Sequence, residues 1–169
     1  MAIIVFFQKK SLLTLFLEGE SPYMQLAAGG LVGLVSAILA LTLINSTFFA
    51  KEKQFYVRII DSFDLNISGV IFLSWCAGIG EEIFFRGAIQ PYPDIFWTSL
   101  LFVFIHGYLN PKKLRLTAYG LVLTGIIVVF GLLFERIGLL ATISAHAVFD
   151  MVLLYKLILG TDQQLDAES

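Results

Sequence analysis

The sequence predicts an all-α fold, a polytopic membrane helix bundle of about five transmembrane helices around a buried polar site. The chain has 169 residues, of which 58% are hydrophobic and only 14% are charged, and its mean hydropathy is +0.86. Soluble domains average about 45–50% apolar and about 25% charged residues. The apolar stretches lack the period-2 alternation of strands, and a helix satisfies its own backbone in lipid. The length favours one bundle over two domains.

The N-terminal residues 1–22 are predicted to be an apolar or interfacial segment that precedes the bundle. Residues 1–7 are apolar, but Lys9 and Lys10 follow them, which is the reverse of the order in a signal peptide. Residues 11–20 are typical of a short amphipathic or interfacial helix. Residues 23–160 are expected to form the bundle, and the polar tail 161–169 is expected to be frayed or disordered.

Five apolar stretches approach the roughly 20 residues that a spanning helix needs. Pro22 begins the first stretch, and Pro91 and Pro93 end the second, because proline cannot continue the helical hydrogen-bond ladder. The third stretch is short and is closed by Asn110 and Pro111. The predicted spans are residues 23–49, 66–90, 95–109, 116–134 and 137–159.

Small residues occur every fourth position in the first span. Gly29, Gly33 and Ala37 form one such row, and rows of this kind let helix backbones approach closely. We expect them to serve packing; they permit dimerisation without requiring it, so the oligomeric state stays open. The single cysteine, Cys76, excludes an intrachain disulfide and is expected to be a small apolar packing residue.

Basic residues predict the orientation, because cytoplasmic loops are enriched in Lys and Arg. Six of them follow the first or the third span, and three lie on the opposite side, which favours a cytoplasmic C-terminus. The net charge of −2 and the lack of a long basic tract give no sign of a nucleic-acid partner. The six are Lys51, Lys53, Arg58, Lys112, Lys113 and Arg115; the three are Lys9, Lys10 and Arg136.

Charged and histidine side chains inside the predicted spans are the main functional signal, because a charge at bilayer depth costs roughly 2.5–3.5 kcal/mol on insertion scales. With a helical rise of about 1.5 Å per residue, Glu81, His106 and His146 fall within roughly 10 Å of one another in depth. Convergence on one site is therefore geometrically possible. The whole set comprises Glu81, Glu82 and Arg86 in the second span, His106 in the third, and His146 and Asp150 in the fifth.

The spacing within this set separates the two adjacent acids. Glu82 and Arg86 are four residues apart and can pair on one helix face. Glu81 is rotated about 100° from Glu82, so it can point into a cavity while its neighbour is neutralised. His146 and Asp150 share a face in the same way, and Phe102 can pack on the ring of His106.

This set supplies what peptide hydrolysis requires. A carboxylate in an apolar cavity can act as a general base toward water, and histidines with a second acid can stabilise an oxyanion or bind a metal. Glu81, His106, His146 and Asp150 form a plausible zinc ligand set, although the HExxH motif is absent.

The motifs Glu81-Glu82-x-x-x-Arg86, Phe102-x-x-x-His106 and His146-x-x-x-Asp150 resemble the CAAX prenyl endopeptidase and bacterial abortive-infection-like (CPBP) family of intramembrane proteases. Order and gaps match, as do Gly87 and residues 134–138, and the resemblance covers the motif core 67–159. It implies a multi-pass protein of the bacterial plasma membrane that cleaves a membrane-embedded or lipid-linked peptide.

The resemblance also implies roles for the motif residues. Glu81 would be the general base, with Glu82 and Arg86 as orienting neighbours. His106 would position water or bind metal, and His146 with Asp150 would stabilise the oxyanion or complete a metal site. The family has been described as zinc-dependent and as metal-independent, and both remain open here.

Two features depart from the family pattern. The last motif often ends in asparagine, whereas this chain has Asp150, which cannot donate a hydrogen bond unless protonated. The chain is also short, which makes a compact bacterial branch a better fit than the eukaryotic prenyl proteases. Two rival functions remain: a non-enzymatic bacteriocin-immunity or scaffold protein that retains the motif, and an ion-coupled carrier, for which no internal repeat is visible.

Overall fold

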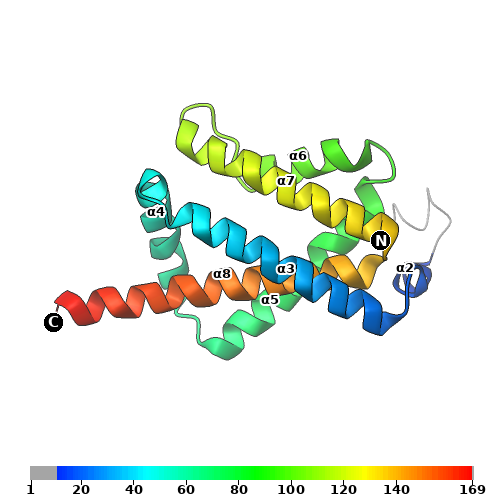
Figure 1. Ribbon diagram of the computed structural model, residues 1–169, viewed down its shortest axis with the longest axis horizontal. Coiled ribbons are helices and arrows are strands. Elements are labelled where there is room, and N and C mark those ends of the chain that lie inside the picture. Colours follow the sequence, from blue (N-terminus) through cyan, green and yellow to red (C-terminus); the bar gives the residue numbers. More distant parts are fainter. Residues whose placement is uncertain (1–10, 169) are drawn as a thin grey trace.

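The computed structural model describes residues 11–168, with side-chain surroundings up to residue 158. These residues form helices and no strand, which confirms the predicted all-α class (Figure 1). The segment 1–10, part of the predicted N-terminal region, lies outside the described residues. The elements are α2 (Leu12–Leu17), α3 (Pro22–Ile44), the 3₁₀ turn η1 (Thr47–Phe49), α4 (Ala50–Asp61), α5 (Ile67–Glu82), the π-helix η2 (Ile83–Ile89), α6 (Asp94–Ile105), α7 (Leu114–Arg136) and α8 (Leu139–Glu168).

Four helical segments in the described part of the chain are long and apolar enough to cross a membrane: Pro22–Ile44, Ile67–Ile89, Leu114–Arg136 and Leu139–Ile158. The predicted third span is shorter than expected, because α6 has only 12 residues and so measures about 18 Å. Helix α6 nevertheless lies alongside α7 and runs antiparallel to it. Ile95 lies beside Gly131 near the end of α7, and Tyr108 lies beside Gly120 near its beginning.

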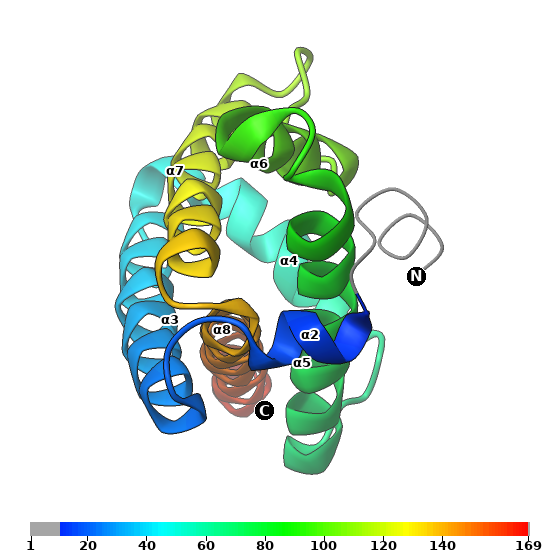
Figure 2. The same cartoon turned by 90° about the vertical axis from the view of Figure 1, so that its right-hand side faces the viewer.

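Helix α8 lies between α3 and α5 (Figure 2). The small residues of α3 face α8. They therefore serve helix packing, as the sequence predicted. A Cβ atom on Gly29 would collide with the backbone carbonyl of Ala141, and one on Gly33 would collide with that of Ala145. The advance of four residues on both helices shows that α3 and α8 run parallel, with their backbones in close contact.

Polar side chains fix where these helices begin. The Ser21 hydroxyl accepts a hydrogen bond from the Met24 amide, and Pro22 takes the first helical position, where its missing N–H costs nothing. Asn66 caps α5 by accepting from the Gly69 amide at 2.9 Å. Buried Gln25 accepts from the amide of Leu140 at 2.9 Å, and so satisfies a backbone donor in the first turn of α8.

Several sequence-based predictions need correction. The first span ends at Ile44, and the next residues form η1 and the amphipathic helix α4, where a loop was expected. Helix α8 continues to Glu168, so the helix does not end at Gly160 and the tail 161–168 is helical. Cys76 is exposed, because the buried face of α5 consists of Val70, Ser74, Gly78 and Glu82.

Candidate active site

Glu82 and Arg86 form the buried ion pair that their spacing predicts. The Arg86 Nε donates to Glu82 Oε2 at 2.9 Å, and both side chains are 0% exposed. The other guanidinium nitrogens donate to Gln90 Oε1 at 3.0 Å and to the carbonyl oxygen of Ile127 at 3.2 Å. Arg86 therefore ties α5 and η2 to α7 while it neutralises Glu82.

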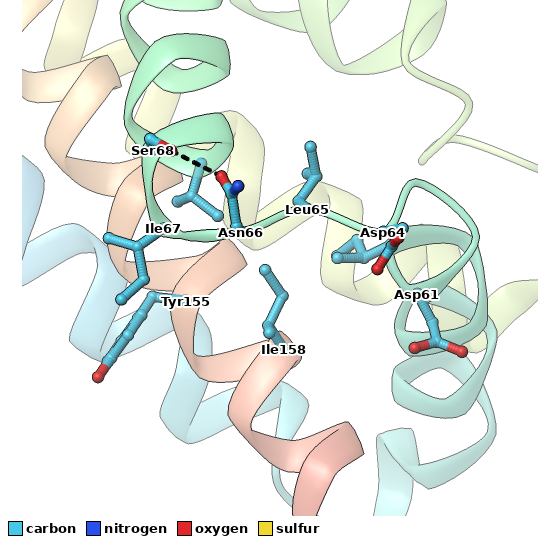
Figure 3. A pocket seen from close by; sticks show the side chains of 10 residues that line it. Asp61, Asp64, Leu65, Asn66, Ile67, Ser68, Tyr155 and Ile158 are labelled. Atoms are coloured by element: carbon cyan, nitrogen blue, oxygen red, sulfur yellow. Dashed lines mark hydrogen bonds between the residues drawn. The ribbon is translucent and has the colours of Figure 1, made fainter.

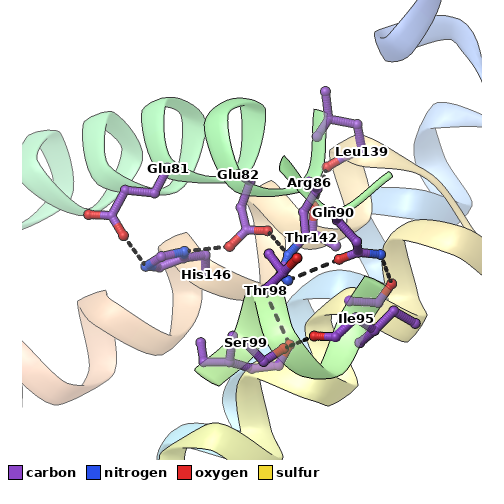
Figure 4. Close-up of polar contacts among 12 residues, drawn as sticks. Glu81, Glu82, Arg86, Gln90, Ile95, Thr98, Ser99, Leu139, Thr142 and His146 are labelled. Carbon is purple, nitrogen blue, oxygen red and sulfur yellow. Dashed lines mark hydrogen bonds and ion pairs between the residues drawn. The ribbon is translucent and has the colours of Figure 1, made fainter. Parts of the chain in front are cut away.

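Gln90 extends this network and was missed by the sequence analysis. Its amide nitrogen donates to the carbonyl oxygen of Gly131 at 3.3 Å and to Glu135 Oε1 at 3.2 Å. Figure 4 shows Gln90 next to Arg86, on the side away from Glu82. A signal was present, since Gln90 lies four residues after Arg86 and eight after Glu82 and so continues their face.

Glu82 also orients His146. The Nδ1 atom of His146 lies 2.8 Å from Glu82 Oε1, and a carboxylate that is paired with arginine accepts hydrogen bonds. Nδ1 therefore carries the proton of this bond. The opposite ring nitrogen, Nε2, faces Asp150 Oδ2 at 3.5 Å and Glu81 Oε2 at 3.9 Å.

His106 is oriented in a parallel way. Its Nδ1 lies 2.7 Å from the carbonyl oxygen of Phe102, which can only accept, so this nitrogen also carries a proton. Its Nε2 lies 3.4 Å from Glu81 Oε2. The ring stacks on Phe102 with centroids 4.3 Å apart, as the spacing predicts, and Phe102 also contacts His146 edge-on.

A glycine turn ends α6 directly after His106. The amide of Gly107 donates to the carbonyl of Phe104 at 3.0 Å, and that of Tyr108 donates to the carbonyl of Val103 at 3.3 Å. This Schellman pattern requires a left-handed residue, and Gly107 has φ +79°. The turn holds His106 at the helix end and directs the chain toward α7.

The π-helix η2 begins directly after the two acids. The amide of Gln90 donates to the carbonyl of Phe85 at 2.8 Å, five residues back. Such wide turns are rare and often occur at functional sites. Here the wide turn carries Arg86 and leads to Gln90, the two side chains that tie this helix to α7.

Glu81 and the two imidazoles border one small cavity of about 180 Å³. The Glu81 side chain is 32% exposed, unlike Glu82, and its buried Oε2 atom accepts no well-oriented hydrogen bond. A free carboxylate oxygen that faces two imidazole nitrogens can hold a water and take its proton. The cavity is lined by Glu81, His106, Tyr108, His146 and Asp150 among apolar residues. The structure thus brings Glu81, His106, His146 and Asp150 together, with Glu82 and Arg86 behind them.

The donor types match those that zinc uses, since two imidazole Nε2 atoms and two carboxylates lie nearby. However, among the residues whose side chains the structure describes, no group of three or more His, Cys, Asp or Glu is placed to hold a metal ion. Zinc binding by Glu81, His106, His146 and Asp150 therefore stays a prediction, and the chemistry below uses protein groups alone.

A larger cavity of about 600 Å³ lies where the connection between α4 and α5 meets α8 (Figure 3). It is bordered by Asp61, Asp64 and Tyr155 and by none of the predicted site residues. Its acids are exposed, as expected of solvated surface groups.

Comparison with known families agrees with this geometry. Residues 63–152 match the model of the type II CAAX prenyl endopeptidase Rce1-like family, which is more than half of the chain. The chain belongs to this family. The matched segment contains all six predicted site residues, from Glu81 to Asp150. No curated protein and no solved structure matched significantly.

Membership places the chain in a family of proteases, and its apolar spans make it an integral membrane protein. The family resemblance read from the three motifs is thereby confirmed. The match assigns no role to an individual residue, so the roles are argued from the geometry.

Proposed function

We propose that this protein is an intramembrane endopeptidase that hydrolyses a peptide bond of a membrane-embedded or lipid-linked substrate with water activated by Glu81. The observation that carries the proposal is the position of Glu81 Oε2, which lies 3.4 Å from His106 Nε2 and 3.9 Å from His146 Nε2 in a small, largely apolar cavity and accepts no well-oriented hydrogen bond. Glu82 is excluded from this role because Arg86 and His146 occupy both of its oxygens.

In the proposed reaction, Glu81 takes a proton from water as the water oxygen bonds to the scissile carbonyl carbon. His106, held by Phe102, positions that water through Nε2. The carbonyl oxygen becomes an oxyanion. When the tetrahedral intermediate collapses, the C–N bond breaks and the amine leaves with the proton that Glu81 had taken.

His146 is the main electrostatic partner in this scheme. Glu82 holds its ring through Nδ1, so Nε2 keeps a fixed direction into the cavity, and preorganised groups stabilise developing charge without reorganisation. Asp150 lies 3.5 Å from this nitrogen and favours the positively charged imidazole that stabilises an oxyanion. Glu82, Arg86 and Gln90 act through His146 as positioning residues.

Glu81→Gln tests the proposal. We expect turnover of quenched-fluorescent peptides in lipid vesicles, assayed with and without a farnesyl-cysteine, to fall roughly 10²–10⁴-fold, the usual contribution of a general base. The thermal midpoint should stay near that of the wild type, because the Glu81 side chain is 32% exposed and its contacts with the two imidazoles are long, at 3.4 and 3.9 Å. Cys76→Ser, on the exposed face of the same helix, is the matched control and should retain activity. Full turnover by Glu81→Gln would overturn the proposal.

Metal dependence is tested separately. The steps above use only protein groups, so they predict that turnover survives exhaustive chelation. The predicted zinc ligands Glu81, His106, His146 and Asp150 predict instead that the purified protein carries one zinc ion per chain and loses turnover on chelation. Metal analysis of the wild type and of His146→Ala decides the matter. Stoichiometric zinc that is lost on substitution, together with loss of turnover on chelation, would replace this scheme by a zinc-dependent one.

A further inference from the structure

The catalytic cavity is rich in acceptors and poor in neutral donors. Glu81 and Asp150 offer carboxylate oxygens, which donate only when protonated. The two imidazoles use Nδ1 for Phe102 and Glu82, so each ring can reach the reacting atoms only through Nε2. An oxyanion that forms beside the carboxylate of Asp150 therefore needs a hydrogen-bond donor in addition to the imidazole of His146.

We propose, resting on the proposed function, that Tyr108 is a further catalytic residue whose phenol O–H donates to the oxyanion of the scissile carbonyl. Tyr108 lines the cavity together with Glu81, His106, His146 and Asp150. Among the described residues that line this cavity, it carries the only hydroxyl. The bond is a hydrogen bond, and the proton stays on the phenol throughout.

The fold holds Tyr108 in this place. The turn at Gly107 sets Tyr108 two residues after His106, with its amide bound to the carbonyl of Val103 at 3.3 Å. Its ring packs between those of Tyr56 and Tyr119, with centroid distances of 5.6 and 6.1 Å. The residue therefore links α4 and α7 to the catalytic cavity.

Tyr56 supports the position of Tyr108. Its ring lies 5.6 Å from that of Tyr108 between centroids, and both residues border a second cavity of about 330 Å³. This cavity adjoins the catalytic one and shares Tyr108, Phe149 and Asp150 with it. Tyr108 thus stands at the boundary between the acids and a largely apolar space that could hold the substrate chain.

The phenol remains protonated under ordinary conditions. Burial, together with the negative charges of Asp150 and Glu81, raises the pKa of Tyr108 to about 12. Burial likewise raises the pKa of Tyr56. The phenol of Tyr108 therefore keeps the proton that it would donate to the oxyanion.

The test is Tyr108→Phe, which keeps the ring and removes the hydroxyl. Loss of one oxyanion donor costs about 10²–10³-fold in kcat in a well-studied protease, so we expect kcat on the farnesyl-cysteine peptide to fall at least about 10²-fold. KM and the thermal midpoint should change little. Tyr119→Phe is the control, because Tyr119 borders only the adjoining cavity, and it should retain kcat. The proposal would be contradicted if Tyr108→Phe raised KM or lowered the thermal midpoint and left kcat unchanged.

A second measurement separates catalysis from packing. Asp150→Asn introduces an amide donor beside the same oxyanion, so Tyr108→Phe should cost markedly less in this background than in the wild type, a coupling that a double-mutant cycle measures. Equal losses in both backgrounds would overturn the role of Tyr108.

Glu81→Gln is assayed alongside, so that the two proposals fail separately. If Glu81→Gln retains turnover, the proposed function itself is wrong. If Glu81→Gln is inactive while Tyr108→Phe keeps the full wild-type kcat, the assignment of Tyr108 alone is wrong.

Discussion

At the scale of single residues, the two adjacent acids show how one helix turn separates a fully paired, buried carboxylate from one that borders a cavity. Glu82 is 0% exposed and accepts from Arg86 and His146, whereas Glu81 has a buried oxygen without a hydrogen-bond partner. The sequence predicted this division, because spacing of four pairs Glu82 with Arg86 and a rotation of about 100° moves Glu81 off that face. It did not predict Gln90 or Tyr108, whose partners lie on other helices and depend on tertiary packing.

Substitutions of the two acids are predicted to differ in their effect on stability. Glu82→Gln leaves the guanidinium of Arg86 buried without its counter-charge, and breaking a buried pair costs roughly 3–5 kcal/mol. We therefore expect a clear fall in the free energy of unfolding of the detergent-solubilised protein, whereas Glu81→Gln should change it little. Thermal unfolding followed by circular dichroism measures both.

Replacing both partners of the pair provides the control. In Glu82→Leu with Arg86→Met no buried charge is left, so stability should recover in part, while turnover should stay low because His146 loses the acceptor that orients it. A Glu82→Gln protein as stable as the wild type would contradict the assigned role of the pair.

At the scale of elements, the boundaries of the apolar helices were predictable and their irregularities were not. Asn66 and Gln90 bracket α5 and η2 as expected, because a cap and two prolines mark these positions in the sequence. The π-turns of η2 carry no comparable signal, since they arise where Arg86 and Gln90 bind the carbonyls of α7. The sequence predicts a loop where α4 lies, because this segment is too short and too polar to span a membrane.

The close contact between α3 and α8 can be tested by two glycine-to-alanine substitutions in α3, one inside the contact and one outside it. In Gly33→Ala the new methyl group would collide with the backbone of Ala145, next to His146, so α3 or α8 must shift. Overpacking of this kind costs about 1–3 kcal/mol, and we expect a lower thermal midpoint together with reduced turnover.

Gly30→Ala is the control on the same helix. Its methyl group would meet only Ser144 Oγ at 3.7 Å, an ordinary contact, and alanine is favoured over glycine in a helix by up to about 1 kcal/mol. Its thermal midpoint should be equal or higher. Equal behaviour of Gly30→Ala and Gly33→Ala would show that close backbone approach at Gly33 is not required.

At the scale of the whole molecule, the structure has four long apolar helices where the sequence predicted five spans. The remaining predicted span, residues 95–109, corresponds to the shorter apolar helix α6. Helix α6 is short, but it carries the chain from Gln90 toward the beginning of α7, and its end places His106 and Tyr108 at the cavity. The composition predicted the helical membrane class. The positions of the helices around α8 depended on packing that a hydropathy pattern does not encode.

The same path predicts the sidedness of the protein. The two basic connections meet at one end of the bundle, where Lys113 lies 5.0 Å from the ring centroid of Phe55 and Arg115 donates to the carbonyl of Phe48 at 3.3 Å. Arg136 ends α7 at the opposite end. Because basic loops favour the cytoplasm, we expect the end that contains Lys53 and Lys112 to be cytoplasmic.

Cysteine accessibility tests this arrangement. Cys76 is the only cysteine, so Cys76→Ser provides a cysteine-free background for Lys53→Cys, Lys112→Cys and Arg136→Cys. In intact cells a membrane-impermeant maleimide should label only Arg136→Cys, and in inverted vesicles it should label the other two. Labelling of Lys53→Cys and Lys112→Cys from different sides would contradict the path of the chain. Labelling of both from outside would show that the orientation is the reverse of the predicted one. The basic clusters would then lie on the side that the positive-inside rule disfavours.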